Sequence, residues 1–241
     1  AFVTASCNIK MTAKRLAWAK FLNAGQTCIA PDYVMVDAAV EADFLQALVA
    51  EIKRQKFSIE NSNYVQIIND DNFERVSKMI DTEKLYHGGN LDAAQRLIEP
   101  TVLYNVAFDD AVMQEEIFGP ILPVIRYENL DDAISRVREL PKPLSAYVFT
   151  ASAKMKNKVL QQLSFGGGMV NDAVMHIVNS ELPFGGVGMS GIGSYHGKAG
   201  FDCFSHKKSI VEKANWFELP LKHGPHSASS LKWIKRLMKF Q

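Results

Sequence analysis

Apolar residues recur at helical spacing in some segments of this chain and gather into short runs in others. The helical spacing predicts helices over residues 11–22, 41–57, 69–80, 129–139 and 152–163. The short apolar runs predict strands at residues 1–5, 33–36, 98–104, 121–127, 146–149 and 169–170, with a late strand at 209–211. Strands that alternate with helices of this length are typical of parallel βαβ units. We therefore expect an α/β fold with an open, mostly parallel sheet and helices on both faces.

The most informative motif lies directly behind the first predicted helix, in the run Asn23-Ala24-Gly25-Gln26-Thr27-Cys28-Ile29-Ala30. Gly25 allows a sharp turn out of the helix, so Cys28 would be presented on that turn. A cysteine thiolate is a strong nucleophile, and neighbouring backbone N–H groups can stabilise an oxyanion. The alternative interpretation is a small buried cysteine in a tight turn.

Two further segments have a composition that suits ligand binding. The run from Glu115 to Pro120 places carboxylates beside Phe118 on a Gly-Pro turn, which suits a ribose and a planar ring, although such acidic turns are often merely solvated. The run from Pro183 to Gly191 is rich in glycine and permits close approach of the backbone to a ligand. No Gly-Lys-Ser/Thr follows those glycines, so the segment is not a phosphate-binding loop of that type.

Composition narrows the class of protein. The chain has 241 residues, is 47% hydrophobic and carries a formal net charge of +1, values that indicate one large or two small globular domains. No apolar run is long enough to predict a membrane span. Its three cysteines lack paired spacing, which favours a reducing, cytoplasmic setting. We expect no metal site, because no Cys/His cluster has zinc-ligand spacing, and no nucleic-acid partner, because the predicted folded part is not basic.

Four segments together resemble the catalytic half of the aldehyde dehydrogenase superfamily, from residue 1 to about residue 213. They are Gly25–Cys28, Glu99–Val102, Glu115–Pro120 and Pro183–Gly186, in the order and spacing of that family. Finer details resemble its class 3 branch: Ile29–Tyr33 after the cysteine, Gly188, and Ser194–Gly197. Members of that branch are mostly homodimers that oxidise aromatic and medium- or long-chain aldehydes, and the resemblance implies the same here.

The resemblance also implies roles for individual residues. Cys28 would attack the aldehyde and form a thiohemiacetal, which becomes a thioester that water hydrolyses. Glu116 would hold the nicotinamide ribose of NAD or NADP, and Phe118 would pack near the nicotinamide ring. His176 and Phe184 would line the passage through which the substrate enters.

The same comparison predicts the domain organisation. Residues 1–205 would form the catalytic domain, 206–215 an oligomerisation strand and 216–241 a basic C-terminal tail. The family's general base is a Glu in a Glu-Leu-Gly-Gly motif upstream of the cysteine, and the 27 residues before Cys28 contain no such motif. We therefore expect the dinucleotide-binding half to be absent from this chain, and the chain alone to be inactive.

Residues 231–240 of the tail segregate on a helical wheel into a basic face and an apolar face. Ser229 and Ser230 are candidate caps of this helix. Its apolar face would either dock on a partner subunit or lie on a membrane surface, so the expected location is cytoplasmic, with peripheral membrane contact as the alternative.

Two rival functions remain open. One is acyl transfer to coenzyme A on the same scaffold, against which the class 3 details argue. The other is a non-catalytic fragment that acts only in oligomerisation.

Overall fold

The computed structural model describes residues 1–58, 60 and 62–240, and its chain divides into two compact units. The first unit is Ala1–Phe204 and the second begins at Ser205.

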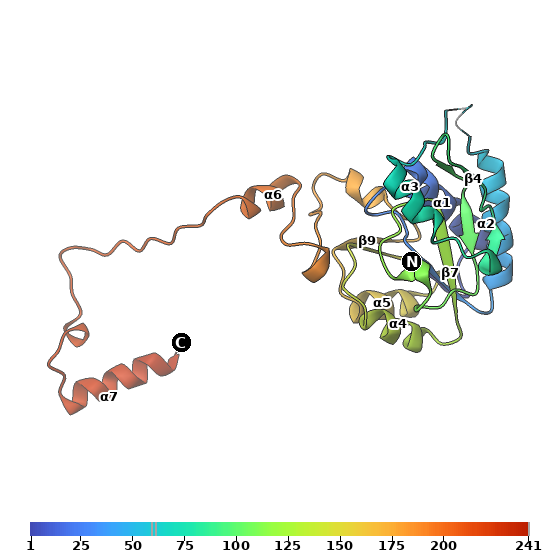
Figure 1. The fold of residues 1–241 in the computed structure, drawn as a ribbon. Coiled ribbons are helices and arrows are strands. Elements are labelled where there is room, and N and C mark those ends of the chain that lie inside the picture. The colour runs from blue at the N-terminus through green and yellow to red at the C-terminus, as the bar shows by residue number, and fades with distance from the viewer. Residues whose placement is uncertain (59, 61, 241) are drawn as a thin grey trace. The chain divides into compact units, whose positions relative to one another are not determined.

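The first unit is built on a seven-stranded sheet with the order β3-β6-β7-β2-β1-β8-β9 (Figure 1). Its strands are β1 (Phe2–Val3), β2 (Val34–Asp37), β3 (Leu85–His87), β6 (Thr101–Leu103), β7 (Ile121–Tyr127), β8 (Ser145–Phe149) and β9 (Gly167–Val170). All neighbouring pairs are parallel except β3 with β6. A separate antiparallel pair joins β4 (Leu91–Asp92) to β5 (Leu97–Ile98). The open, mostly parallel sheet predicted from the sequence is confirmed.

Helices cover both faces of this sheet. One core cluster packs α1 (Ile9–Phe21) and α2 (Glu41–Gln55) against the sheet. The other cluster holds the buried residues of α3 (Asp70–Ser77), α4 (Leu130–Arg138) and α5 (Ala153–Gln162). Buried strand residues alternate between the two clusters, as Val34 and Met35 do, because successive side chains of a strand point to opposite faces. The short helix α6 (Gly197–Cys203) ends the unit.

Side-chain caps explain where several of these helices begin. Asn8, Asn69, Asn129 and Ser152 each accept a hydrogen bond from a backbone N–H in the first turn of the helix that follows. Such caps satisfy N–H groups that have no partner within the helix. At the start of α3, for example, the side chain of Asn69 accepts from the N–H of Asn72.

Two of the differences between the structure and the predicted elements have a clear local cause. The strand expected over residues 98–104 is interrupted after Ile98, because Pro100 has no N–H to offer a ladder. The helix predicted over residues 11–22 is α1, which ends at Phe21, and Leu22 is exposed because the chain then turns away.

In the second unit, residues 205–214 form neither helix nor strand. A strand forms by pairing with a neighbouring strand. The oligomerisation strand predicted at 206–215 would have its neighbour in a second subunit, so it stays a prediction. The expected tail helix is present as α7 (Ala228–Leu237), but its cap was placed wrongly. The side chain of Ser227 accepts from the N–H of Ser230, and Ser229 and Ser230 lie inside the first turn. Among the residues described, no helix combines the length and apolar character that crossing a membrane requires.

Candidate active site

Cys28 lies on a tight turn between α1 and β2. After α1 the backbone enters the left-handed region at three successive residues, Asn23, Ala24 and Gly25, with φ of 54°, 52° and 73°. The turn that follows is closed by the Ala30 N–H, which donates to the Thr27 carbonyl over 2.9 Å. The Cys28 side chain is exposed, whereas the next residue, Ile29, is 1% exposed. The predicted turn is therefore present. It buries the side chain of Ile29 and leaves the thiol of Cys28 exposed.

Gly25 brings the cysteine turn against the Glu115–Pro120 turn. A Cβ added to Gly25 would lie 2.2 Å from the carbonyl oxygen of Gly119, closer than any side-chain carbon can approach. Glycine is thus required here both for its positive φ and for the contact between the two backbones. This contact brings Cys28 and Glu116 to the same edge of the sheet.

Side chains from two other segments fix the turn that carries Glu116. The carboxylate of Asp32 accepts the N–H of Ile117 over 3.1 Å. Arg75 on α3 donates to the carbonyls of Glu116 and Ile117, over 3.1 and 2.8 Å. Phe118 has a φ of 46° and is 38% exposed, so its ring is presented to solvent by a strained backbone.

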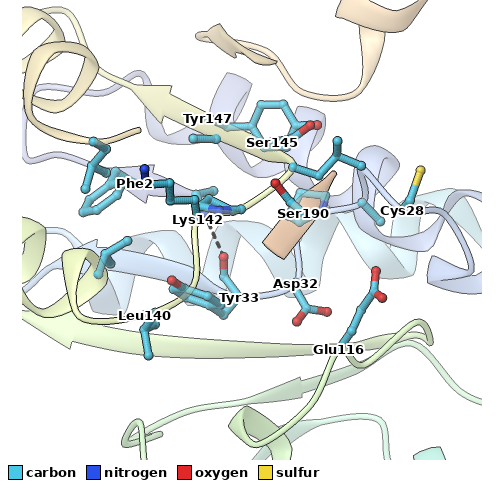
Figure 2. A pocket seen from close by; sticks show the side chains of 18 of the residues that line it. Phe2, Cys28, Asp32, Tyr33, Glu116, Leu140, Lys142, Ser145, Tyr147 and Ser190 are labelled. Atoms are coloured by element: carbon cyan, nitrogen blue, oxygen red, sulfur yellow. Dashed lines mark hydrogen bonds between the residues drawn. The ribbon is translucent and has the colours of Figure 1, made fainter. Parts of the chain in front are cut away.

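Cys28, Glu116 and Phe118 all line one cleft of about 800 Å³ (Figure 2). Its walls come from the segments that lead into β1, β2, β7, β8 and β9, with Met189 and Ser190 of the glycine-rich segment contributing to it. The cleft therefore opens at the amino ends of the parallel strands. Figure 2 shows the carboxylates of Asp32 and Glu116 near each other, with Glu116 reaching toward the part of the cleft that holds Cys28.

Burial and mutual charge shift three titratable groups of this region. Burial lowers the pKa of the Lys20 ammonium to about 8, opposed by the negative charges of Asp32 and Glu116. Burial raises the pKa of Asp32, opposed chiefly by Lys20 and by the hydrogen bond from Ile117. The pKa of Glu116 is raised by partial burial and by the nearby charge of Asp32. Groups whose pKa values shift through burial and a specific charge partner are common at functional sites.

His176 and Phe184 lie outside the residues that line the cleft, but they are connected to its wall. The His176 Nε2 atom is 3.3 Å from the hydroxyl of Ser145, and its ring contacts those of Tyr147 and Phe184 at centroid distances of 5.9 and 6.0 Å. Ser145 and Tyr147 themselves line the cleft. Tyr147 donates to the Ile29 carbonyl over 2.7 Å, which links this aromatic cluster to the cysteine turn.

Burial lowers the pKa of His176, and its Nδ1 atom is buried with no hydrogen-bond partner in the part of the chain that the structure describes. A neutral imidazole in an aromatic cluster suits the wall of an apolar passage. This position is compatible with the substrate-lining role expected for His176 and Phe184.

Sequence reasoning missed Lys20, Asp32, Arg75 and Tyr147. A signal existed for Lys20, which lies four residues after Leu16 and three after Ala17 and so occupies the buried stripe of α1. Asp32, Arg75 and Tyr147 form hydrogen bonds to backbone groups that lie 41 to 118 residues away along the chain. No local pattern in the sequence reveals such partners.

The cleft suits a nicotinamide dinucleotide better than a metal. Carboxylate oxygens such as those of Glu116 accept hydrogen bonds from vicinal ribose hydroxyls, and Phe118 offers an exposed ring beside them. Within the described ranges, no group of three or more His, Cys, Asp or Glu side chains is arranged to hold a metal ion.

Comparison with known proteins shows the family to which the chain belongs. The family model described as "Aldehyde dehydrogenase family" matches residues 1–210. The chain is 43% identical to a 4,4'-diaponeurosporen-aldehyde dehydrogenase of Staphylococcus aureus, over 98% of this chain and 52% of that protein. It is 40% identical to mouse aldehyde dehydrogenase family 3 member A2, over 97% of this chain and 49% of that protein.

A solved structure, the substrate-bound state of Staphylococcus aureus AldH, superposes with a TM-score of 0.89 at 41% identity. That match covers 98% of this chain and 53% of the solved chain. The chain thus spans about half the length of the relatives it matches. With the family model covering most of its length and a cysteine turn meeting a glutamate turn at one cleft, this chain belongs to the aldehyde dehydrogenase family.

Proposed function

We propose that this chain provides the catalytic half of an enzyme that oxidises an aldehyde to its carboxylic acid with NAD or NADP. The observation that carries the proposal is the meeting of Cys28 and Glu116 in one cleft of about 800 Å³. Two segments almost ninety residues apart converge there through the backbone contact between Gly25 and Gly119. A non-catalytic role in oligomerisation alone would not require an exposed thiol beside a carboxylate in a cleft.

Cys28 performs the covalent chemistry in this proposal. Its sulfur attacks the aldehyde carbon, and the carbonyl oxygen of the substrate becomes the oxyanion of a thiohemiacetal. The backbone N–H of Cys28 helps to stabilise that oxyanion. Loss of a hydride from the former aldehyde carbon leaves a thioester, and water then releases the acid and the free thiol.

Glu116 and Phe118 would hold the dinucleotide. Glu116 accepts the ribose hydroxyls next to the nicotinamide, and Phe118 packs near that ring. When bound, the dinucleotide supplies the acceptor for the hydride. Orientation of the acceptor at near-attack distance is a large part of the catalytic effect. Relatives include a rat enzyme named as dimeric and NADP-preferring, and the choice between NAD and NADP remains open for this chain.

The substrate would be an aromatic or a medium- to long-chain aliphatic aldehyde. Tyr147 lines the cleft and is backed by the rings of His176 and Phe184, and an aromatic surface of this kind favours an extended apolar substrate over a small polar one. The Staphylococcus aureus relative is named for the aldehyde of 4,4'-diaponeurosporene, which accords with this preference.

Assembly and location extend the same proposal. Residues 1–205 form the catalytic domain, and 206–215 pair as a strand with the partner in a homodimer. In the tail, α7 has Leu231, Trp233 and Leu237 exposed in the single chain, and these side chains dock on the partner subunit. The alternative occupant of that face is an anionic membrane surface. The enzyme would work in the cytoplasm.

Cysteine substitution in the intact enzyme tests the proposal. Cys28→Ala should lower aldehyde oxidation by about a thousandfold or more, because it removes the thiol that forms the covalent intermediate in this mechanism. Cys7→Ala and Cys203→Ala, the matched controls, should leave the rate largely unchanged. An active Cys28→Ala enzyme would refute the mechanism, and formation of an acyl-coenzyme A thioester in place of the free acid would favour acyl transfer.

A further inference from the structure

Lys20 is a cation held in the protein interior close to the carboxylates of the cleft. It lies in the last turn of α1 and its side chain is 1% exposed. The burial of an ammonium is costly unless negative charges compensate it. Asp32 and Glu116 are the two groups whose charges act most strongly in its favour.

Asp32 connects the cysteine turn to the glutamate turn. It follows Cys28 by four residues, and its carboxylate accepts the N–H of Ile117. Arg75 holds the carbonyl of Glu116, which belongs to the same peptide unit as that N–H. Since a peptide unit is planar, holding both its N–H and its C=O fixes the direction in which the Glu116 side chain leaves the backbone.

The strength of this clamp depends on the ionisation of Asp32. A hydrogen bond to an ionised carboxylate is shorter and stronger than one to a neutral acid. Asp32 is faced by Lys20 from α1, Arg75 from α3 and Glu116 from the clamped turn. Burial disfavours the ionised form of Asp32, whereas Lys20, the hydrogen bond from Ile117 and Arg75 favour it.

We propose that Lys20 and Asp32 are positioning residues: the buried ammonium keeps Asp32 ionised, and Asp32 aligns the Glu116 carboxylate with Cys28 through the N–H of Ile117. In this proposal Lys20 and Asp32 act through the Glu116 turn and not on the reacting atoms. The catalytic consequence rests on the proposed function of Glu116, whereas the electrostatic part can be tested without any aldehyde.

The electrostatic part is tested by NMR. The amide proton signal of Ile117 should move upfield when acid protonates Asp32, because its acceptor loses its charge. Lys20→Met, which keeps the length of the side chain, should raise the midpoint of that change by about one pH unit or more, as expected when an opposite charge nearby is removed. Lys14→Met, on the exposed side of the same helix, should leave the midpoint in place.

An unchanged midpoint in folded Lys20→Met would overturn the role of Lys20. If that variant does not fold, Asp32→Asn supplies the test in the intact enzyme. It should lower the rate of hydride transfer about tenfold in the wild-type background, as expected for loss of alignment, and have no further effect in a Glu116→Gln background. Equal effects in both backgrounds would show that Asp32 is only structural. The NMR result stands even if the aldehyde activity itself were disproved.

Discussion

The two ends of the parallel strands differ in how they use their polar groups. At the carboxyl ends, the hydroxyls of Thr4 and Ser6 bond to that of Thr150, over 2.8 and 2.9 Å. The side chain of Asn171 bonds to both backbone groups of Thr150. These polar groups satisfy one another within the described chain. At the amino ends, Cys28 and Glu116 instead face an open cleft of about 800 Å³.

This arrangement is the reverse of the usual one. Ligands of open α/β sheets generally bind outside the carboxyl ends of the strands. Here the carboxyl ends carry a pocket of about 270 Å³ near β1 and β8 and one of about 600 Å³ near β7, whereas Cys28 and Glu116 lie in the cleft of about 800 Å³ at the opposite edge. In this chain the site lies where the fold leaves polar side chains without partners among the described residues. The fold class alone does not determine that position.

After loss of Cys28, the largest effect on activity at the amino ends is expected for Glu116→Gln. Loss of the charge should lower kcat about a hundredfold through poorer alignment of the hydride acceptor. Hydride transfer should then limit the rate, which is measured as a larger isotope effect with deuterated aldehyde. Glu115→Gln is the matched control, since Glu115 is exposed and contacts Arg75 at 3.5 Å. Equal losses in both variants would contradict a specific role for Glu116.

At the carboxyl ends the expected effect is on stability alone. Thr150→Val removes the hydroxyl that joins Thr4 and Ser6 and should lower the free energy of unfolding by about 1–3 kcal/mol. Urea unfolding measures this loss, and kcat for aldehyde oxidation should stay the same. A large drop in kcat for a folded Thr150→Val enzyme would contradict the assignment of the carboxyl ends to stability alone.

The buried cation of the amino edge predicts a pH dependence of stability. The pKa of Lys20 falls from 10.5 to about 8 on folding, so between these values the unfolded chain binds the proton that the folded chain has released. The contribution of Lys20 to stability therefore rises with pH through this window and is lost as pH falls through about 8.

Comparison of the wild type with Lys20→Met isolates this contribution, because the other lysines titrate in both. The difference in unfolding free energy between the two proteins should shift in favour of the wild type as pH rises from about 8 to 10.5. A difference that is constant across this range would mean that Lys20 keeps an ordinary pKa.

The smallest effect is expected away from both edges, in the tail. Truncation after Ser227 removes α7 and should weaken the dimer or alter substrate preference, while binding to anionic vesicles stays at background. If α7 instead lies on membranes, the intact enzyme should co-sediment with such vesicles, and added salt should weaken the binding. If the intact enzyme does not bind vesicles, and truncation changes neither dimer stability nor substrate preference, both proposed roles of the tail are contradicted.

Much of the fold was predictable because local patterns specify it. The periodic segments that became α2 and α4, and the apolar run of β7, match the structure to within one or two residues at most ends. The turn at Cys28 was predictable because Gly25 marks it. In contrast, the break at Pro100 overrode an apolar run, and Leu22 became exposed through a left-handed turn that no periodicity shows.

The supports of the candidate site were less accessible to sequence reasoning. A lysine in a helical pattern is usually solvated, so the burial of Lys20 depends on charges that come from a later loop and a distant turn. Asp32 and Ile117 are brought together only when β2 and β7 pair. Such partners are set by sheet topology, which a local motif does not contain.

The central claim, that Cys28 is the nucleophile of this cleft, is tested most directly by trapping its intermediate. The intact enzyme would be mixed with aldehyde and NAD(P), quenched in acid within the first turnover, and digested for mass spectrometry. The account predicts an acyl group on the peptide that contains Cys28 and none on those with Cys7 or Cys203. Product formation with an unmodified Cys28 peptide at every quench time, or acylation of another residue, would contradict it.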